Sequence, residues 1–249
     1  MKAKVGELDV HYELVGPAGA PCVVFVHGLA ASLEVWQCQA ERFGDDFRVL
    51  RYDLRSHGGS GHSDAPCSRS DLADDLVGLL DALDIDRAAV VGHSAGGAVA
   101  LQAAVDHGDR LWALGAIGTA SVANKAAFDF YGQCIEAGLA EGGAAVMRAM
   151  RMKPESGPAP HGTGFAPVAE AMRTLHTDPL TDRLGEIATP TLIVVGDKDF
   201  LGVGGSVILD RGIADSELHI VPGRRHGFFG EQPDEFAAIL RPFLERVRD

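Results

Sequence analysis

A serine with glycines close on both sides is the first residue of this chain whose setting suggests chemistry. Residues 92–96 read Gly-His-Ser-Ala-Gly and fit the pattern G-x-S-x-G, which alone is weak evidence. They follow the apolar run 88–91, which predicts a buried strand. They open the Ala-rich segment 95–107, which predicts a helix capped by Gly108. A serine on such a sharp strand-to-helix turn projects its hydroxyl beside the free N–H groups of the helix. Ser94 is therefore a candidate nucleophile.

A serine nucleophile requires a base, and the base requires an acid that orients it. Two aspartates, Asp197 and Asp199, directly follow the predicted strand 191–195, and either one could reach a site at the carboxyl edge of a sheet. His226 lies after the last predicted strand, 218–221, and before the last predicted helix. The chain order serine, aspartate, histidine is that of one particular fold. This position favours His226 as the base.

Acyl transfer also needs two N–H donors aimed at the oxygen that becomes negatively charged. The sequence His-Gly-Leu-Ala at residues 27–30 follows the buried run 22–26, at the same predicted edge of the sheet. The backbone N–H groups of Leu29 and Ala95 are the candidate donors of an oxyanion hole. For His27 itself we expect a structural role, with its ring bonded to the backbone.

Strands that alternate with helices must position these residues. The apolar and β-branched runs that predict strands are 10–15, 22–26, 48–52, 88–91, 113–117, 191–195 and 218–221. Helical spacing of apolar residues predicts helices over 71–83, 95–107 and 234–247. We expect an α/β protein with a mainly parallel sheet covered by helices on both faces, and with residues 10–15 in an N-terminal hairpin.

One interval departs from this alternation. Residues 119–186 contain helical patterns and no convincing strand, with a turn-rich stretch at 154–164. The sequence therefore predicts a core formed by residues 1–118 and 187–249, and a helical cap inserted as residues 119–186.

Five stretches together resemble the α/β-hydrolase fold family, in the group of small esterases and lactonases. They are Val24-Phe25-Val26-His27-Gly28, Tyr52-Asp53-Leu54-Arg55-Ser56-His57-Gly58, Val91-Gly92-His93-Ser94-Ala95-Gly96-Gly97, Pro190-Thr191-Leu192-Ile193-Val194-Val195-Gly196-Asp197-Lys198-Asp199 and His226-Gly227-Phe228-Phe229. The resemblance implies an α/β-hydrolase fold and a catalytic triad of Ser94, Asp199 and His226. The acid is Asp199 because the family pattern G-x-x-D has it at the fourth position. One departure is Ser56, where many relatives have glycine.

The resemblance implies a serine hydrolase that cleaves a carboxylic ester or lactone of a small, largely apolar substrate through an acyl-enzyme on Ser94. No metal or organic cofactor is expected. A second hypothesis keeps the fold and changes the chemistry, since relatives with similar triads include carbon–carbon bond hydrolases, perhydrolases and cofactor-independent oxygenases. A third is a binding protein that senses a ligand in the pocket, because fold does not dictate function.

Apolar side chains near the motifs and in the predicted cap are candidate substrate contacts. These candidates are Trp36, Phe128, Tyr131, Met147, Phe200, Leu201 and Phe228. A core position is as good an interpretation for Trp36. Four of the five methionines lie in the cap, where ordinary helix packing explains them at least as well as an adaptable pocket. A basic cluster of Arg148, Arg151 and Lys153 would either meet a substrate carboxylate or form a solvated helix face.

The composition limits the partners. The 22 basic and 35 acidic residues among 249 give a net charge of −13, which disfavours a nucleic-acid surface. The cap, with six basic and eight acidic residues, is nearly neutral and compatible with an anionic small substrate. The sequence has neither the apolar segment of a signal peptide nor a membrane span. We therefore expect a cytoplasmic monomer or homodimer with reduced thiols.

Overall fold

The computed structural model describes residues 1–152 and 156–248, and its centre is one eight-stranded sheet. The strand order is β1-β2-β4-β3-β5-β6-β7-β8. Strands β3 to β8 are parallel, whereas β2 pairs antiparallel with both β1 and β4. The strands are β1 (Lys2–Val5), β2 (Leu8–Val15), β3 (Cys22–Val26), β4 (Arg48–Tyr52), β5 (Ala88–His93), β6 (Leu111–Ile117), β7 (Thr191–Gly196) and β8 (Ser216–Val221). The predicted α/β class and mostly parallel sheet are confirmed.

The central strand β3 is apolar throughout because both faces of the sheet are covered there. All five residues of β3 are buried. Val24 and Val26 belong to one hydrophobic cluster, and Val23 and Phe25 belong to the other, on the opposite face of the sheet. Alternation along a strand therefore supplies two cores, and this accounts for the uninterrupted apolar run in the sequence.

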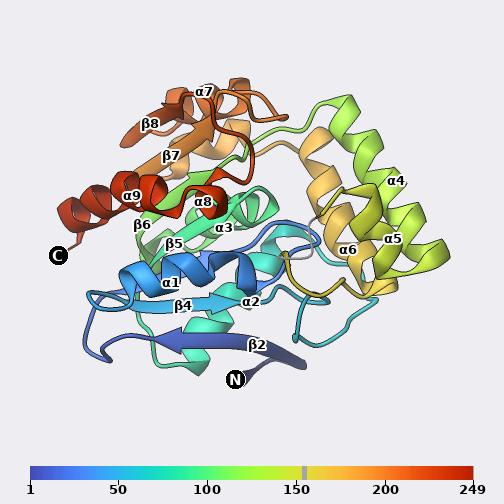
Figure 1. Ribbon diagram of the computed structural model, residues 1–249, viewed down its shortest axis with the longest axis horizontal. Helices are drawn as coiled ribbons and strands as arrows, with labels where there is room; N and C mark the ends of the chain where they lie inside the picture. Colours follow the sequence, from blue (N-terminus) through green and yellow to red (C-terminus); the bar gives the residue numbers. More distant parts are fainter. Residues whose placement is uncertain (153–155, 249) are drawn as a thin grey trace.

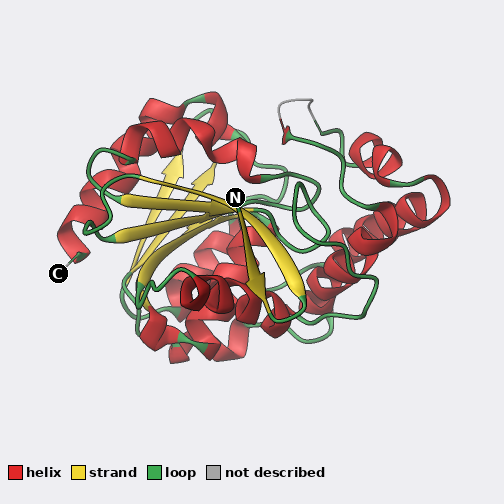
Figure 2. Cartoon of the chain, turned by 90° about the horizontal axis from the view of Figure 1, so that it is seen from below, coloured by secondary structure: helices red, strands yellow, loops and turns green. Residues whose placement is uncertain are grey.

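Helices lie on both faces of the sheet, as Figure 2 shows. Helices α2 (Arg69–Ala82), α3 (Ala95–Asp106) and α7 (Gly204–Gly212) contribute to the first cluster. Helices α1 (Gln37–Phe43), α8 (Phe228–Glu231) and α9 (Pro233–Val247) contribute to the second, and the short η1 (Leu33–Trp36) leads into α1. No helix among the described residues combines the length and apolar character needed to cross a membrane.

The prediction that Gly108 forms the C-terminal cap of the helix after Ser94 is wrong. Helix α3 ends at Asp106 with His107 as its C-cap, and Gly108 begins the 3-10 helix η2 (Gly108–Arg110). Gly108 has no positive φ, which a left-handed glycine cap requires. The chain instead tightens directly into η2 before it enters β6.

Between β6 and β7 the described residues form helices and no strand. These are α4 (Lys125–Glu141), α5 (Gly143–Ala149), α6 (Gly162–Arg173), η4 (Thr174–His176) and η5 (Thr181–Glu186). Helices α4, α5 and α6 pack together at one side of the molecule, on the right in Figure 1. This arrangement agrees with a helical insertion, and the division into a core and a cap with boundaries at residues 119 and 186 stays a prediction.

Ser56, the residue that departs from the family pattern, adopts a left-handed backbone conformation with φ 61°. This conformation favours glycine, which many relatives have there. The Ser56 hydroxyl donates to the Ser63 carbonyl at 3.2 Å and accepts the Ser63 N–H at 3.1 Å. The backbone carbonyl of Ser56 accepts the N–H of His161, at the start of α6. The side chain thus closes a tight loop, and the backbone carbonyl ties this loop to the start of α6.

Replacing Ser56→Gly is expected to destabilise the protein by about 1 kcal/mol. Losing two hydrogen bonds costs about 2 kcal/mol, and relief of the left-handed conformation returns about 1 kcal/mol. Ser56→Ala loses the same bonds without that relief, so it should be the less stable of the two variants. Urea unfolding measures the free energy of unfolding of the wild type and both variants. A Ser56→Gly variant more stable than the wild type would contradict the prediction.

Candidate active site

Ser94 lies on a strained turn between β5 and α3. Its backbone angles are φ 56° and ψ −119°, outside the regions that a residue with a side chain normally adopts. Only glycine fits around it. A Cβ at Gly92 would lie 2.1 Å from the Gly96 carbonyl oxygen, and a Cβ at Gly96 would lie 2.3 Å from that of Val26. The two glycines of the pattern G-x-S-x-G therefore permit the close packing that holds Ser94 in this conformation.

His226 is held by Asp199 at the carboxyl edge of the sheet. The His226 Nδ1 is 2.8 Å from Asp199 Oδ2, and the Asp199 side chain is 1% exposed. The other oxygen, Oδ1, accepts the N–H of Leu201 at 2.9 Å. Asp197, which the residue pattern alone had left open as the acid, is exposed and accepts the N–H of Gly223 at 2.7 Å. The structure thus pairs Asp199, not Asp197, with the histidine.

Gly118 joins the serine turn to the Asp199–His226 pair. It follows β6 with φ +53°, and a Cβ there would lie 3.1 Å from Asp199 Oδ2 and 3.2 Å from His226 Nδ1. The preceding residue, Ile117, accepts the Ser94 N–H with its carbonyl at 2.9 Å. Gly118 was not among the residues predicted from the sequence. The available signal was a glycine at the carboxyl end of the predicted strand 113–117.

The backbone beside Ser94 offers two hydrogen-bond donors. Among the described residues, the N–H groups of Leu29 and Ala95 have no acceptor within the protein. Ala95 is the first residue of α3. The segment that carries Leu29 lies against the serine, because a Cβ at Gly28 would be 3.2 Å from the Ser94 Cβ. Two unengaged donors, of which the Ala95 N–H lies at a helix N-terminus, suit an oxygen that gains negative charge.

Two buried neutral histidines support the segment that carries Leu29. His57 Nδ1–H donates to the Arg55 carbonyl at 2.9 Å, which leaves Nε2 to accept the N–H of Ala30 at 3.2 Å. His27 likewise donates from Nδ1 to the Gly28 carbonyl and accepts the Leu54 N–H at Nε2. Burial lowers the pKa of both rings, that of His57 to about 3. These bonds fix Ala30 in a left-handed conformation of φ 58° and give His27 the structural role expected for it.

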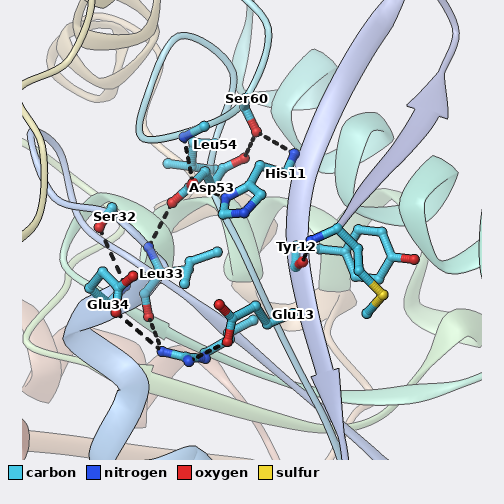
Figure 3. Close-up of polar contacts among 12 residues, drawn as sticks. His11, Tyr12, Glu13, Ser32, Leu33, Glu34, Asp53, Leu54 and Ser60 are labelled. Atoms are coloured by element: carbon cyan, nitrogen blue, oxygen red, sulfur yellow. Dashed lines mark hydrogen bonds and ion pairs between the residues drawn. The ribbon is translucent and has the colours of Figure 1, made fainter.

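Asp53 anchors the far end of the same segment (Figure 3). Its Oδ1 accepts the N–H of Leu33 at 2.7 Å, and its Oδ2 lies 2.7 Å from His11 Nδ1 and 2.8 Å from the Gly59 N–H. The Ser60 hydroxyl donates to the Asp53 carbonyl and accepts the His11 N–H. The loop after β3 is thus tied at both ends to the loop after β4.

Of the tentative pocket residues, Phe200 and Leu201 lie at the acid–base pair. The Phe200 ring centroid is 4.5 Å from that of His226, yet 74% of the residue is exposed, and Leu201 is 41% exposed. An exposed aromatic ring against a candidate base is available to contact a bound molecule. These two residues form an apolar rim beside His226.

The other pocket candidates are buried or partly buried. Trp36 is 0% exposed and packs between Phe25 and Phe229, so it occupies the core position that the sequence had left open. Phe228 is also buried in this cluster. The candidates on α4 and α5 are partly buried, and the Phe128 ring lies under the Arg173 guanidinium. They are Phe128, Tyr131 and Met147.

The predicted basic cluster does not form a site in the described residues. Arg148 pairs with Glu141 at 2.8 Å, and both side chains are about two-thirds exposed, 65% and 66%. Arg151 is exposed, and Lys153 lies outside the described residues.

The four cysteines are free thiols. Within the described residues, no group of three or more histidine, cysteine or carboxylate side chains is arranged to hold a metal ion.

Comparison with known proteins gives consistent matches over the whole chain. Residues 23–239 match the model of the family described as "Alpha/beta hydrolase family". A protein named "Putative carbamate hydrolase RutD" from Variovorax paradoxus is 31% identical, over 96% of this chain and 97% of that protein. "3-oxoadipate enol-lactonase 1" from Acinetobacter baylyi is 26% identical, over 95% of this chain and 93% of that protein.

Solved structures give the same picture. An enol-lactonase from Burkholderia xenovorans superposes with a TM-score of 0.88 at 26% identity, covering 98% of this chain and 100% of that one. A thermophilic esterase from Thermogutta terrifontis, with malate bound, also gives a TM-score of 0.88 at 26% identity, covering 100% of this chain and 99% of that one. The similarity therefore extends over the helices between β6 and β7 as well as the sheet.

The low pKa of His57 predicts a loss of stability in mild acid. The folded protein binds the proton only near pH 3, whereas the unfolded chain binds it near 6.5. Stability is therefore complete above about pH 6.5 and falls as the pH decreases from there towards 3. His57→Gln keeps an acceptor for the Ala30 N–H and removes this titration. Between pH 7 and pH 5, unfolding free energy should fall by about 2 kcal/mol more in the wild type than in the variant. Urea unfolding at both pH values measures this, and equal pH dependence would rule it out.

Proposed function

The chain belongs to the alpha/beta hydrolase family, and we propose that it is a serine hydrolase for a carboxylic ester or lactone of a small, largely apolar substrate. The reaction passes through an acyl-enzyme on Ser94. The observation that carries this proposal is the 2.8 Å contact between His226 Nδ1 and Asp199, next to the strained turn that presents Ser94. A serine, a base and an orienting acid at one sheet edge are the parts that acyl transfer requires.

Each residue has one task in the proposed mechanism. Asp199 accepts the Nδ1–H of His226, so that Nε2 is free to take the Ser94 proton as the hydroxyl attacks the carbonyl. The N–H groups of Leu29 and Ala95 stabilise the oxyanion, and each donor contributes about 3 kcal/mol to lowering the barrier. His226 then protonates the leaving alcohol and activates the water that releases the acyl group.

The relatives and the apolar rim support the substrate class. Hydrolase activity is common to the named relatives, and an enol-lactonase and an esterase are among the similar structures at 26% identity. Phe200 and Leu201 expose apolar surface beside His226, where the group attached to the scissile carbonyl would pass. A small apolar substituent is the group that such a rim favours.

A carbamate is the second candidate substrate. The 31% identical relative is named as a carbamate hydrolase and covers nearly the whole chain. The same parts would attack a carbamate carbonyl, and water would release an alcohol and carbamic acid, which decomposes to carbon dioxide and ammonia. Ammonia release therefore distinguishes a carbamate from an ester or lactone.

Replacing Ser94→Ala tests the nucleophile. The variant should lose turnover on a panel of esters, lactones and carbamates, and should lose covalent labelling by a fluorophosphonate probe, because no oxygen remains to attack. We expect a loss of at least a thousandfold, within the roughly million-fold range that a missing nucleophile costs. Labelling or turnover that persists in Ser94→Ala would overturn the proposal. Oxygen uptake with an aromatic substrate would support oxygenase chemistry instead.

Matched substitutions of the neighbouring residues Asp197 and Asp199 test which of them is the orienting acid. Asp199→Asn should lower kcat by about a thousandfold or more, because the amide cannot orient His226 in the required tautomer. Asp197→Asn keeps an oxygen for the Gly223 N–H and should stay within about twofold of the wild type. Steady-state kinetics of both variants on one substrate give the comparison. Equal losses in the two would refute the assignment of Asp199.

A further inference from the structure

His93, the residue before Ser94, bonds directly to the backbone of the candidate base. Its Nε2 is 2.9 Å from the carbonyl oxygen of His226, a residue 133 positions further along the chain. A carbonyl oxygen only accepts, so Nε2 carries the proton of the His93 ring. The pattern G-x-S-x-G sets no residue type at this position, so the pattern alone predicts no role for His93.

Burial keeps this donor neutral. His93 is 9% exposed, and desolvation is the main reason that its pKa lies well below the usual value. Nearby His226 and His27 lower it further, and the bond to the His226 carbonyl opposes this without reversing it. A neutral ring with hydrogen on Nε2 has a bare Nδ1. His93 therefore adds no positive charge beside His226 at the moment when that ring takes a proton.

The ring also contacts the other parts of the site. Its centroid is 4.4 Å from the His226 ring and 4.5 Å from that of Phe229. On the oxyanion side, a Cβ at Gly28 would lie 3.4 Å from His93 Nδ1. One side chain thus contacts the segment of the base and the segment of Leu29, while its own backbone continues into Ser94.

We propose that His93 is a positioning residue, which fixes the distance between Ser94 and His226 by donating its Nε2–H to the His226 carbonyl. This inference rests on the proposed function, because it assigns His226 the role of the base. Asp199 orients the imidazole from its side chain, and His93 holds the backbone from which that side chain extends. Without this hydrogen bond, His226 on the loop after β8 would still contact Asp199. Its distance from Ser94 would no longer be fixed. A displacement of about 1 Å lowers the rate of such reactions by about a hundredfold.

Two substitutions separate the hydrogen bond from packing. His93→Gln has an amide N–H at about the reach of Nε2, and His93→Met has similar length and no donor. We expect His93→Met to lower kcat by about 10- to 100-fold with little change in KM, and His93→Gln to recover most of that loss. Thermal unfolding of both variants shows whether each is folded. Equal kcat in the two folded variants would overturn the proposal.

NMR of the ¹⁵N-histidine-labelled protein tests the same inference without turnover. In the wild type, His93 should remain the neutral Nε2–H tautomer from pH 8 to about pH 5. The Nδ1–H signal of His226 should be visible in the wild type and in His93→Gln, and broadened in His93→Met. A His93 ring with its proton on Nδ1 instead of Nε2, or a His226 signal unchanged in His93→Met, would refute the positioning role. Turnover that survives in Ser94→Ala would refute the proposed function instead, so the two failures are distinct.

Discussion

The site depends on the left-handed conformation of one residue with a side chain, Ser94. Such a conformation costs roughly 1–3 kcal/mol and persists only where the surrounding packing enforces it. Here the enforcement is backbone against backbone, since Gly92 meets Gly96 and Gly96 meets the end of β3 at distances that no Cβ permits. Packing of α3 against the sheet therefore fixes the direction of the serine hydroxyl. It also leaves the Ala95 N–H at the helix start without an internal acceptor.

The remaining parts are brought to this turn by buried polar groups that carry no charge. His27, His57 and His93 each donate from one ring nitrogen to a backbone carbonyl, and burial lowers the pKa of all three. A neutral imidazole suits this task, because it joins loops by hydrogen bonds without the large penalty of a buried charge. The buried carboxylate of Asp53 instead accepts hydrogen bonds from two backbone N–H groups and lies within hydrogen-bond distance of His11 Nδ1. The loops at the sheet edge are consequently held by networks of buried hydrogen bonds.

Local patterns predicted most of the sheet and the order of its chemistry-bearing loops. Buried strands have continuous apolar runs, and parallel strands bring their carboxyl ends to one edge, so Ser94 and His226 were proposed from the pattern G-x-S-x-G and from their places after predicted strands. Choosing Asp199 over Asp197 required the family pattern, because both follow the same strand. Gly118 and His93 were not predicted from the sequence because their roles are contacts between segments distant in the chain. Gly108 misled because its position signalled a left-handed cap, whereas the chain turned into a 3-10 helix.

Substrate choice is harder to predict for a related physical reason. The residues that would surround a substrate come from separate segments, and sequence does not give the distances between them. Phe200 reaches the site because the Asp199 carboxylate holds the N–H of Leu201 and so fixes this loop. From the other side, the Ser156 carbonyl accepts the N–H of Ser32, which links the chain between α5 and α6 to the loop that carries Leu29. In the proposed mechanism the chemistry depends on residues at the sheet edge, while the shape presented to a substrate depends on how the loops around that edge and the helices between β6 and β7 pack.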